Sequence, residues 1–526
     1  MKERLEALAY ELCAPESAKA LAPRFSKLIN QYRDKIQQPD DEWDPQLPLD
    51  ETDVFLLVHE DQFFDDATEP ATLLHEFLAT QLEGMVRGVH VVSAGASMKD
   101  IQQLSREYRL MVDLAPAHEQ QAEQQAEQQA EQQAEQQAEQ QAEQQAEQQA
   151  AYDYSDPEVV LGLLEMMLKY LVAGVSAFRL ISDSQQQKRN DTNHHDVTDH
   201  VATDHVVNDN EATDIRVVAR LSRAVLSELA PWSVLATDIT EEAHMVPQYA
   251  PASLVLEAML RGSGEPVRCW ARSLPGLSPA AAYLNVLPAD VLSSVTAPAL
   301  PALQRARVFL CAQAIMLSLA GVPVVDLHSL IGSETPEGDL DRGGVNGHGV
   351  NSGGVNSHGV NSLGGQRLEY STLVDELETP GTLRNVIFEG YKALLQARSC
   401  EPLFHPNVHQ KVLDLNPAVF ALLRTTSQNN GEGVLCIYNL SLDPVELMFS
   451  PAELGLDIEV GMREIIGGDI VFPSDESGGL VSLEVESYEA LWLRTPVHLD
   501  TDENQSFLFA DDEYPVEAAE LEDKED

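Results

Sequence analysis

The chain has 526 residues, of which 86 are acidic and 33 basic, and its formal net charge at pH 7 is −53. An acidic surface repels nucleic acids and anionic lipids, so we expect neither of them as a partner. The length is too great for one ordinary core and predicts a barrel of about 250 residues or more together with a second domain.

The cysteine content and the apolar runs address the location of the protein. The five cysteines are scattered, odd in number and without a metal-type spacing, which favours a reducing cytoplasm. The start, Met1–Glu6, has the pattern of a charged helix rather than of a signal peptide. No apolar run reaches the ~18 residues of a membrane span. We therefore expect a cytoplasmic protein with no membrane partner, and the sequence leaves its oligomeric state open.

The first 398 residues alternate between helical and apolar patterns. Residues 1–50 predict an N-terminal helical segment, and residues 51–398 predict an α/β fold, a (β/α)8 TIM barrel with a parallel core. The predicted barrel strands are Val54–Val58, Gly88–Val92, Leu110–Leu114, Val175–Leu180, Val234–Thr237, His244–Tyr249, Tyr283–Leu287 and Val322–Leu327.

The pattern changes after residue 398. Short apolar runs alternate with turns rich in Asn, Gly, Pro and Asp, which predicts a C-terminal antiparallel β-sandwich domain over residues 399–497. Residues 498–526 are strongly acidic and predict a disordered tail.

Three low-complexity inserts interrupt the predicted barrel, at residues 119–150, 184–214 and 343–365. They follow the third, fourth and eighth predicted strands, which places all three on loops at the C-terminal face. A barrel enzyme keeps its chemistry on that face. The scaffold therefore looks intact, whereas the site looks altered.

Several passages in order resemble one known family. They include Leu74–Leu78, Leu110–Leu114, the strand Val175–Leu180 running into Arg179, Gln313–Leu319 and His328–Ser333. From about residue 53 to residue 493 the chain resembles the sucrose phosphorylase group of the alpha-amylase superfamily (glycoside hydrolase family 13). The resemblance implies glucosyl transfer between an α-glucoside such as sucrose and phosphate, with retention and without a cofactor.

The nucleophile of that family is missing. A retaining mechanism needs two carboxyl groups about 5–5.5 Å apart. In the family an aspartate nucleophile follows Arg-Leu, but here Arg179 and Leu180 are followed by Ile181, which has no oxygen to attack a sugar. Asp183 would lie ~6–7 Å further along the strand, and a misplacement of even ~1 Å can cost about 100-fold in rate.

The other two family carboxylates fall on altered positions. The acid–base glutamate corresponds to Asp238, which is one methylene shorter and would otherwise be a plain surface aspartate at the end of a strand. The third carboxylate corresponds to Val291 in strict register, whereas a shift of one residue would make Asp290 the carboxylate.

Two substrate-binding residues of the family survive, Arg179 and His118. In the family the arginine sits beside the nucleophile; without it, Arg179 would neutralise a nearby acid at the barrel mouth. The resemblance implies a small α-glucoside and phosphate as partners. The lid domain and the arginine-rich loop of the family are, however, replaced by repeats.

Other candidate sites are weaker. The histidines and aspartates between His194 and His205 could bind a divalent metal, but they lie in a repetitive hydrophilic tract, so we predict a loop and no metal. Trp232, Trp270 and Trp492 are predicted as core residues rather than sugar platforms.

Three hypotheses follow from the sequence. The first is a catalytically inactive member of the sucrose phosphorylase group. The second is a non-catalytic glycan-binding or scaffold protein. The third is an active glucosyltransferase with relocated acids. The loss at Ile181, the change at Asp238 and the replaced lid favour the first.

Overall fold

The computed structural model describes most of the barrel and of the C-terminal domain. The described residues are 2–13, 15–37, 49–59, 62–65, 67–91, 98–114, 154, 156–180, 209–237, 245–248, 282–286, 301–333, 367–426, 431–457, 461–472 and 479–496. The three low-complexity inserts and the acidic tail lie outside them, except for residues 209–214, and the backbone alone is described for 209–214, 245–248 and 282–286.

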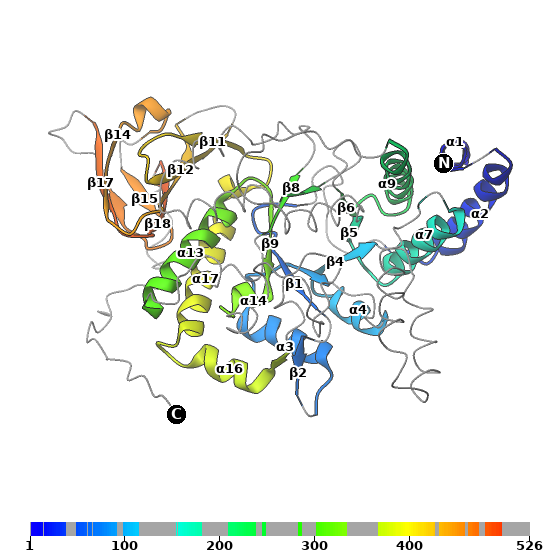
Figure 1. The fold of residues 1–526 in the computed structure, drawn as a ribbon, viewed down its shortest axis with the longest axis horizontal. Coiled ribbons are helices and arrows are strands. Elements are labelled where there is room, and N and C mark those ends of the chain that lie inside the picture. Colours follow the sequence, from blue (N-terminus) through cyan, green and yellow to red (C-terminus); the bar gives the residue numbers. More distant parts are fainter. Residues whose placement is uncertain are drawn as a thin grey trace, which may run out of the picture.

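A closed barrel of parallel strands forms the centre of the molecule (Figure 1). Its strands are β1 Phe55–Val58, β3 Gly88–Val91, β4 Arg109–Leu114, β5 Ala177–Leu180, β6 Val234–Ala236, β7 Met245–Gln248, β8 Ala282–Val286 and β9 Val322–Asp326. They follow one another in chain order around the barrel, and β1 closes it by pairing with β9. Each strand lies within two residues of its predicted run, so the predicted barrel is confirmed.

Alternate residues of the strands fill the barrel with apolar side chains. Phe55 and Leu57 of β1 form a cluster with Met111 of β4 and Ala177 of β5, all of them buried. Gly88 of β3 pairs with Phe55, and a Cβ at Gly88 would collide with the Phe55 ring. A glycine is therefore required there, because the aromatic ring occupies the space a side chain would take.

Helices follow most of the strands and cover the outside of the barrel. They are α3 Pro70–Gln81, α4 Met98–Leu104, α7 Pro157–Val172, α9 Asp209–Leu229, α13 Ala302–Ser318, α14 Leu327–Leu330, α16 Tyr370–Glu378 and α17 Leu383–Ser399. The sequence explains why α7 begins at Pro157. The Asp156 side chain caps the helix by accepting a hydrogen bond from the Glu158 backbone N–H at 2.9 Å, and proline is favoured at the first helical position.

The end of the second low-complexity insert is helical. This insert is expected to reach residue 214, and α9 begins within it, at Asp209. Once a helix is nucleated, each added residue gains one backbone hydrogen bond, and Glu211 and Ala212 favour helix. The apolar stripe of residues 215–229 therefore carries the helix back into the polar tract.

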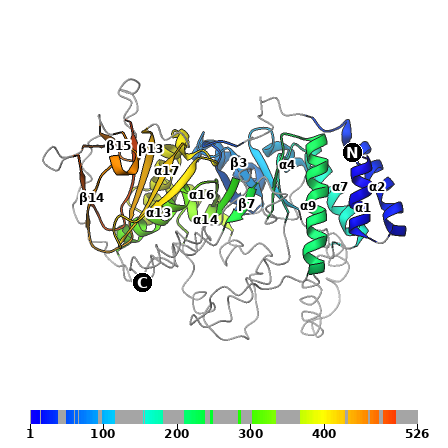
Figure 2. The same cartoon turned by 90° about the horizontal axis from the view of Figure 1, so that it is seen from above.

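Two N-terminal helices, α1 Lys2–Leu12 and α2 Pro15–Arg33, pack against α7 and α9. Figures 1 and 2 place this helical pair at one end of the molecule. Arg24 pairs with Glu158 of α7, and Arg220 of α9 pairs with Glu11. The predicted N-terminal helical segment is thus docked on the barrel helices.

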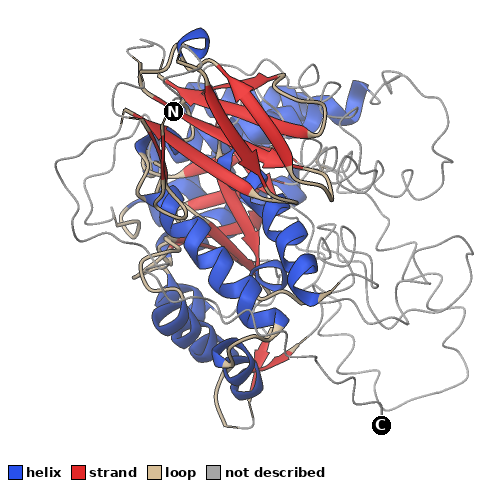
Figure 3. Ribbon diagram, turned by 90° about the vertical axis from the view of Figure 1, so that its left-hand side faces the viewer, coloured by secondary structure: helices blue, strands red, loops and turns tan. Residues whose placement is uncertain are grey.

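The C-terminal domain is antiparallel and lies at the opposite end from α1 and α2 (Figures 1 and 2). Its strands are β11 His409–Leu413, β12 Val419–Thr425, β13 Gly433–Asn439, β14 Val445–Phe449, β15 Met462–Glu464, β16 Ile470–Val471, β17 Val481–Val485 and β18 Ala490–Thr495, with 3-10 turns η2 Pro402–Phe404 and η3 Ala452–Leu454. In the described part, a sheet of order β11-β12-β13-β18-β15-β16 accompanies the pair β14-β17. Figure 3 shows the sheet with helices of the barrel behind it. The predicted β-sandwich domain is confirmed.

The sandwich is joined to the barrel through α13 and α17. The Tyr438 hydroxyl of β13 donates to the Ala314 carbonyl of α13 at 3.2 Å and accepts from Trp492 Nε1 at 2.8 Å. Arg424 of β12 is fully buried and donates to the Ser318 carbonyl at 2.7 Å. Trp492 is fully buried and Trp232 is buried, as predicted, whereas Trp270 lies outside the described residues.

A short parallel pair was not predicted. β2 Phe63–Phe64, after β1, pairs with β10 Leu368–Glu369, which precedes α16. Strands of two residues are too short to show a period of two in the sequence.

In the described part of the chain, no helix combines the length and apolarity needed to cross a membrane.

Candidate functional site

Three polar side chains meet at the C-terminal ends of neighbouring barrel strands. They are His90 of β3, Asp113 of β4 and Arg179 of β5, and their side chains are at most 8% exposed. The register pairs Asp113 with Arg179 directly, and His90 with Met111, two residues before Asp113. Because successive residues of a strand point to opposite faces, these three share the inward face with the apolar layer below them.

The two basic side chains share one oxygen of the carboxylate. His90 Nε2 lies 3.0 Å from Asp113 Oδ1, and Arg179 Nε lies 3.6 Å from the same oxygen. A buried carboxylate is stable only when it is paired and hydrogen-bonded. Asp113 is therefore held as an ion-pair partner at the barrel mouth rather than offered to a ligand as a free nucleophile.

A second polar group follows β9 at the same face. The Asp326 carboxylate caps the short helix α14 by accepting from the backbone N–H groups of His328 at 2.8 Å and Ser329 at 3.3 Å. The buried His328 then places its Nδ1 3.0 Å from the Ser333 hydroxyl. The turn after β9 is thereby fixed at both ends by hydrogen bonds.

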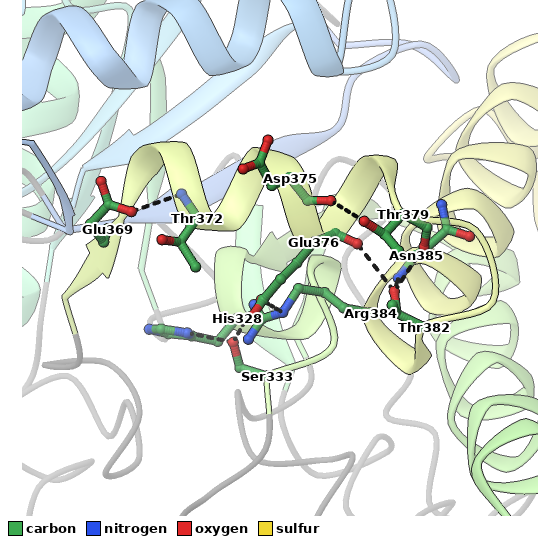
Figure 4. Close-up of polar contacts among 10 residues, drawn as sticks. All are labelled: His328, Ser333, Glu369, Thr372, Asp375, Glu376, Thr379, Thr382, Arg384 and Asn385. Atoms are coloured by element: carbon green, nitrogen blue, oxygen red, sulfur yellow. Dashed lines mark hydrogen bonds and ion pairs between the residues drawn. The ribbon is translucent and has the colours of Figure 1, made fainter. Parts of the chain in front are cut away.

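Arg384 of α17 joins this group from outside the barrel (Figure 4). Its NH1 donates to the Ser333 hydroxyl at 3.4 Å, and its Nε lies 2.9 Å from a carboxylate oxygen of Glu376 in α16. Burial lowers the pKa of Arg384, and the nearby Glu376 opposes that shift. A half-buried cation thus stands beside the loop that leaves β9.

None of the described residues forms a metal-binding group of three or more His, Cys, Asp or Glu side chains. The histidines between His194 and His205, for which a metal was considered, lie outside the described residues.

Comparison with known proteins identifies relatives along nearly the whole chain, although no family model matches. The chain is 26% identical over 608 aligned residues to a glucosylglycerate phosphorylase of Spirochaeta thermophila, covering 93% of this chain and 98% of that protein. It is 21% identical over 405 residues to a glucosylglycerate phosphorylase of Escherichia coli, covering 65% and 64%.

Solved structures support the same fold. An alpha-amylase from H. orenii matches with a TM-score of 0.54 and 13% identity, covering 84% of this chain and 99% of that one. An Anoxybacillus alpha-amylase matches with a TM-score of 0.55 and 11% identity, covering 85% and 99%. The resemblance to the sucrose phosphorylase-like group of the alpha-amylase superfamily is confirmed.

Against the pattern of this group, the predicted site residues divide into two sets. Arg179 lies in the described part of the chain and pairs with Asp113, and its role in substrate binding stays a prediction. The other predicted site residues are Ile181, Asp238, Asp290 and His118, and all four lie outside the described residues. Ile181 directly follows the last residue of β5, and Asp238 follows β6 by two residues.

His90, Asp113 and Arg384 were not predicted as site residues from the sequence. For the first two a signal was present, because each is a charged or polar residue between apolar residues of its strand. No comparable signal existed for Arg384, because its contacts with Ser333 and Glu376 join segments that only the tertiary fold brings together.

Proposed function

We propose that this protein binds the substrates of a glucosylglycerate phosphorylase-like glucosyl transfer at the barrel mouth without completing the reaction. Relatives named glucosylglycerate phosphorylases support the substrate class. Their name specifies two substrates, a glucoside of glycerate and phosphate. The proposed inactivity rests on the sequence Arg179-Leu180-Ile181, because the residue at the nucleophile position of the group is an isoleucine.

Retention requires a covalent glucosyl-enzyme intermediate, formed when a carboxylate attacks the anomeric carbon while a second carboxyl group protonates the leaving oxygen. Ile181 cannot form that bond. Asp113 is a poor substitute, because its register partner is Arg179, which precedes position 181 by two residues in the chain. Two residues of extended strand correspond to ~6–7 Å. Its oxygen Oδ1 is also engaged by His90 and Arg179.

The test separates binding from turnover. Calorimetry with glucosylglycerate should give saturable binding, whereas incubation with glucosylglycerate and phosphate should release no glucose 1-phosphate above a blank. Mass spectrometry after acid quenching should show no mass increase of one glucosyl unit. A glucosylated polypeptide would contradict the proposal directly.

Two other outcomes would favour the remaining hypotheses. Turnover that is lost in Asp183→Asn or Asp238→Asn would identify an active glucosyltransferase with relocated acids. Saturable binding of an unrelated glycan, with none of glucosylglycerate, would point to a glycan-binding or scaffold protein. The cytoplasmic location stays a prediction.

A further inference from the structure

We propose that Arg384 and Ser333 form an oxyanion-binding site at the rim of the barrel, which takes the carboxylate of the glycerate unit or the phosphate. The inference rests on the proposed function, since it names the group of this chain that would recognise the charged part of its substrates. Ser333 ends the turn after β9, and Arg384 is the second residue of α17, so both lie where the strand's C-terminal end meets the next loop (Figure 4).

The donors of Arg384 are only partly used. A guanidinium has five N–H donors and no acceptor. Nε is directed to Glu376 at 2.9 Å and NH1 to Ser333 at 3.4 Å. Among the described residues, NH2 has no hydrogen-bond acceptor. The NH1–NH2 edge can therefore present the fork of parallel donors that matches a carboxylate or a phosphate.

Ser333 holds this guanidinium in place on the barrel side. Because the guanidinium can only donate, the Ser333 Oγ accepts from Arg384 NH1 and keeps its own proton for His328 Nδ1, 3.0 Å away. Both Ser333 and His328 are buried. The cation is thus anchored by a fixed turn before any ligand arrives, which lowers the ordering cost of binding.

Arg384 has one carboxylate partner among the described residues, and that partner is the more exposed of the two. The Arg384 side chain is 24% exposed, whereas that of Glu376 is 49% exposed. Burial lowers the pKa of Arg384, so its cation lacks much of the solvation that water would give. An entering oxyanion would replace that lost solvation.

The surrounding charge opposes the binding of anionic substrates. A chain with a formal net charge of −53 repels glycerate and phosphate at long range. A cation at the rim, next to the positive end of the 17-residue helix α17, provides local attraction that the acidic body does not.

The experiment is calorimetric titration of the full chain with glycerate, with inorganic phosphate and with glycerol, which lacks the carboxylate. Arg384→Met should weaken binding of at least one anion by about tenfold or more, because charge-assisted hydrogen bonds are lost. Arg384→Lys should weaken it less, since the charge remains without the fork. Glu376→Gln should strengthen it, because the competing carboxylate is neutralised.

Lys392→Met is the matched control. Lys392 lies two turns further along α17 and has its own partner, Glu389, at 3.0 Å, so its loss removes the same charge without touching the rim. Anion affinity should be unchanged in this variant. Circular dichroism shows whether Arg384→Met folds. If it does not, Arg384→Lys and Glu376→Gln still test the inference, because a purely structural ion pair would leave the anion affinity of both variants unchanged.

The two anions distinguish the source of the oxyanion. Loss of glycerate binding alone assigns the site to the carboxylate, and loss of phosphate binding alone assigns it to phosphate. Unchanged affinity for both in the Arg384 variants, or a wild-type protein that binds neither, overturns the inference. Turnover of glucosylglycerate by the wild type would refute the proposed inactivity and leave this site standing.

Discussion

Asp53 and Arg109 form an ion pair across the N-terminal end of the barrel, with Arg109 Nε 3.2 Å from Asp53 Oδ1. Asp53 precedes β1 and Arg109 begins β4, and β3 lies between these two strands in the barrel. The Asp53 carboxylate also accepts from the Asp50 backbone N–H at 2.7 Å. Even so, burial dominates over these favourable contacts and raises the pKa of Asp53 to about 6.

This raised pKa predicts a pH dependence of stability. The unfolded chain releases the Asp53 proton near pH 4, whereas the folded protein retains it until about pH 6. The contribution of Asp53 to the free energy of unfolding is therefore largest below pH 4. It falls as the pH rises from 4 to 6 and is constant above pH 6. The fall is ~3 kcal/mol at most.

Asp53→Asn isolates this effect from the other carboxylates, because asparagine imitates the neutral acid. In urea unfolding at several pH values, the free energy of unfolding of the wild type should decline relative to that of Asp53→Asn as the pH rises from 4 to 6.5. A difference that stays constant across this range would show that the carboxyl group titrates normally.

The pairing of Asp113 with Arg179 predicts a strong coupling energy. Asp113→Asn should lower the free energy of unfolding by ~3 kcal/mol, because a buried arginine loses its counter-charge. Arg179→Met should cost a similar amount, and the double variant clearly less than the sum of the two. Urea denaturation of all four proteins measures the cycle.

Asp375→Asn is the control for this cycle, since Asp375 is exposed in α16. Its free energy of unfolding should stay within about 0.5 kcal/mol of the wild type. Additive effects of Asp113→Asn and Arg179→Met would mean that the 3.6 Å contact carries no net stabilisation.

Arg398 is predicted to be essential for the contact between barrel and sandwich. This fully buried residue of α17 donates to the carbonyl oxygens of Leu317, Gly321 and Phe404 at 3.0–3.2 Å, and also to that of Glu51. Burial lowers its pKa to about 9. Arg398→Met leaves these acceptors unsatisfied and should cost at least ~3 kcal/mol.

Thermal unfolding of Arg398→Met against Arg216→Met tests this expectation. Arg216 is exposed on α9, so its replacement removes the same charge at no cost in buried hydrogen bonds. Equal melting temperatures for the two variants would exclude a structural role for the Arg398 guanidinium.

Restoring the nucleophile alone should not restore activity. Ile181→Asp supplies the missing oxygen, but the acid–base position still holds Asp238 and the third carboxylate position Val291. Retention needs two carboxyl groups at the correct separation. We expect no glucose 1-phosphate from glucosylglycerate and phosphate in this variant. Measurable turnover would mean that Asp238 serves as the acid.

The barrel strands could be predicted because parallel strands buried on both faces are continuous apolar runs. β9, Val322–Asp326, for example, is buried throughout and differs from its predicted run only by the loss of Leu327, which α14 takes up. The pairing of β2 with β10 could not be predicted, because two residues carry no periodic signal and their partners lie about 300 residues apart.

The site was predictable only where a single residue carried the information. Arg179 was found from the strand to which it belongs, but its pairing with Asp113 depends on the register between β4 and β5, which the sequence does not contain. The sharing of Ser333 by His328 and Arg384 depends on how α17 docks against the turn after β9. Both are consequences of tertiary packing.

The third low-complexity insert, residues 343–365, is flanked on both sides by backbone hydrogen bonds of the barrel. Before it, the Ser333 backbone N–H donates to the His328 carbonyl at 2.8 Å; after it, the Leu368 N–H donates to the Gln62 carbonyl at 2.7 Å. The two attachment points are thus held by bonds that do not involve the repeat. Repeat units could be gained or lost, or a reporter peptide grafted in their place, without moving either anchor.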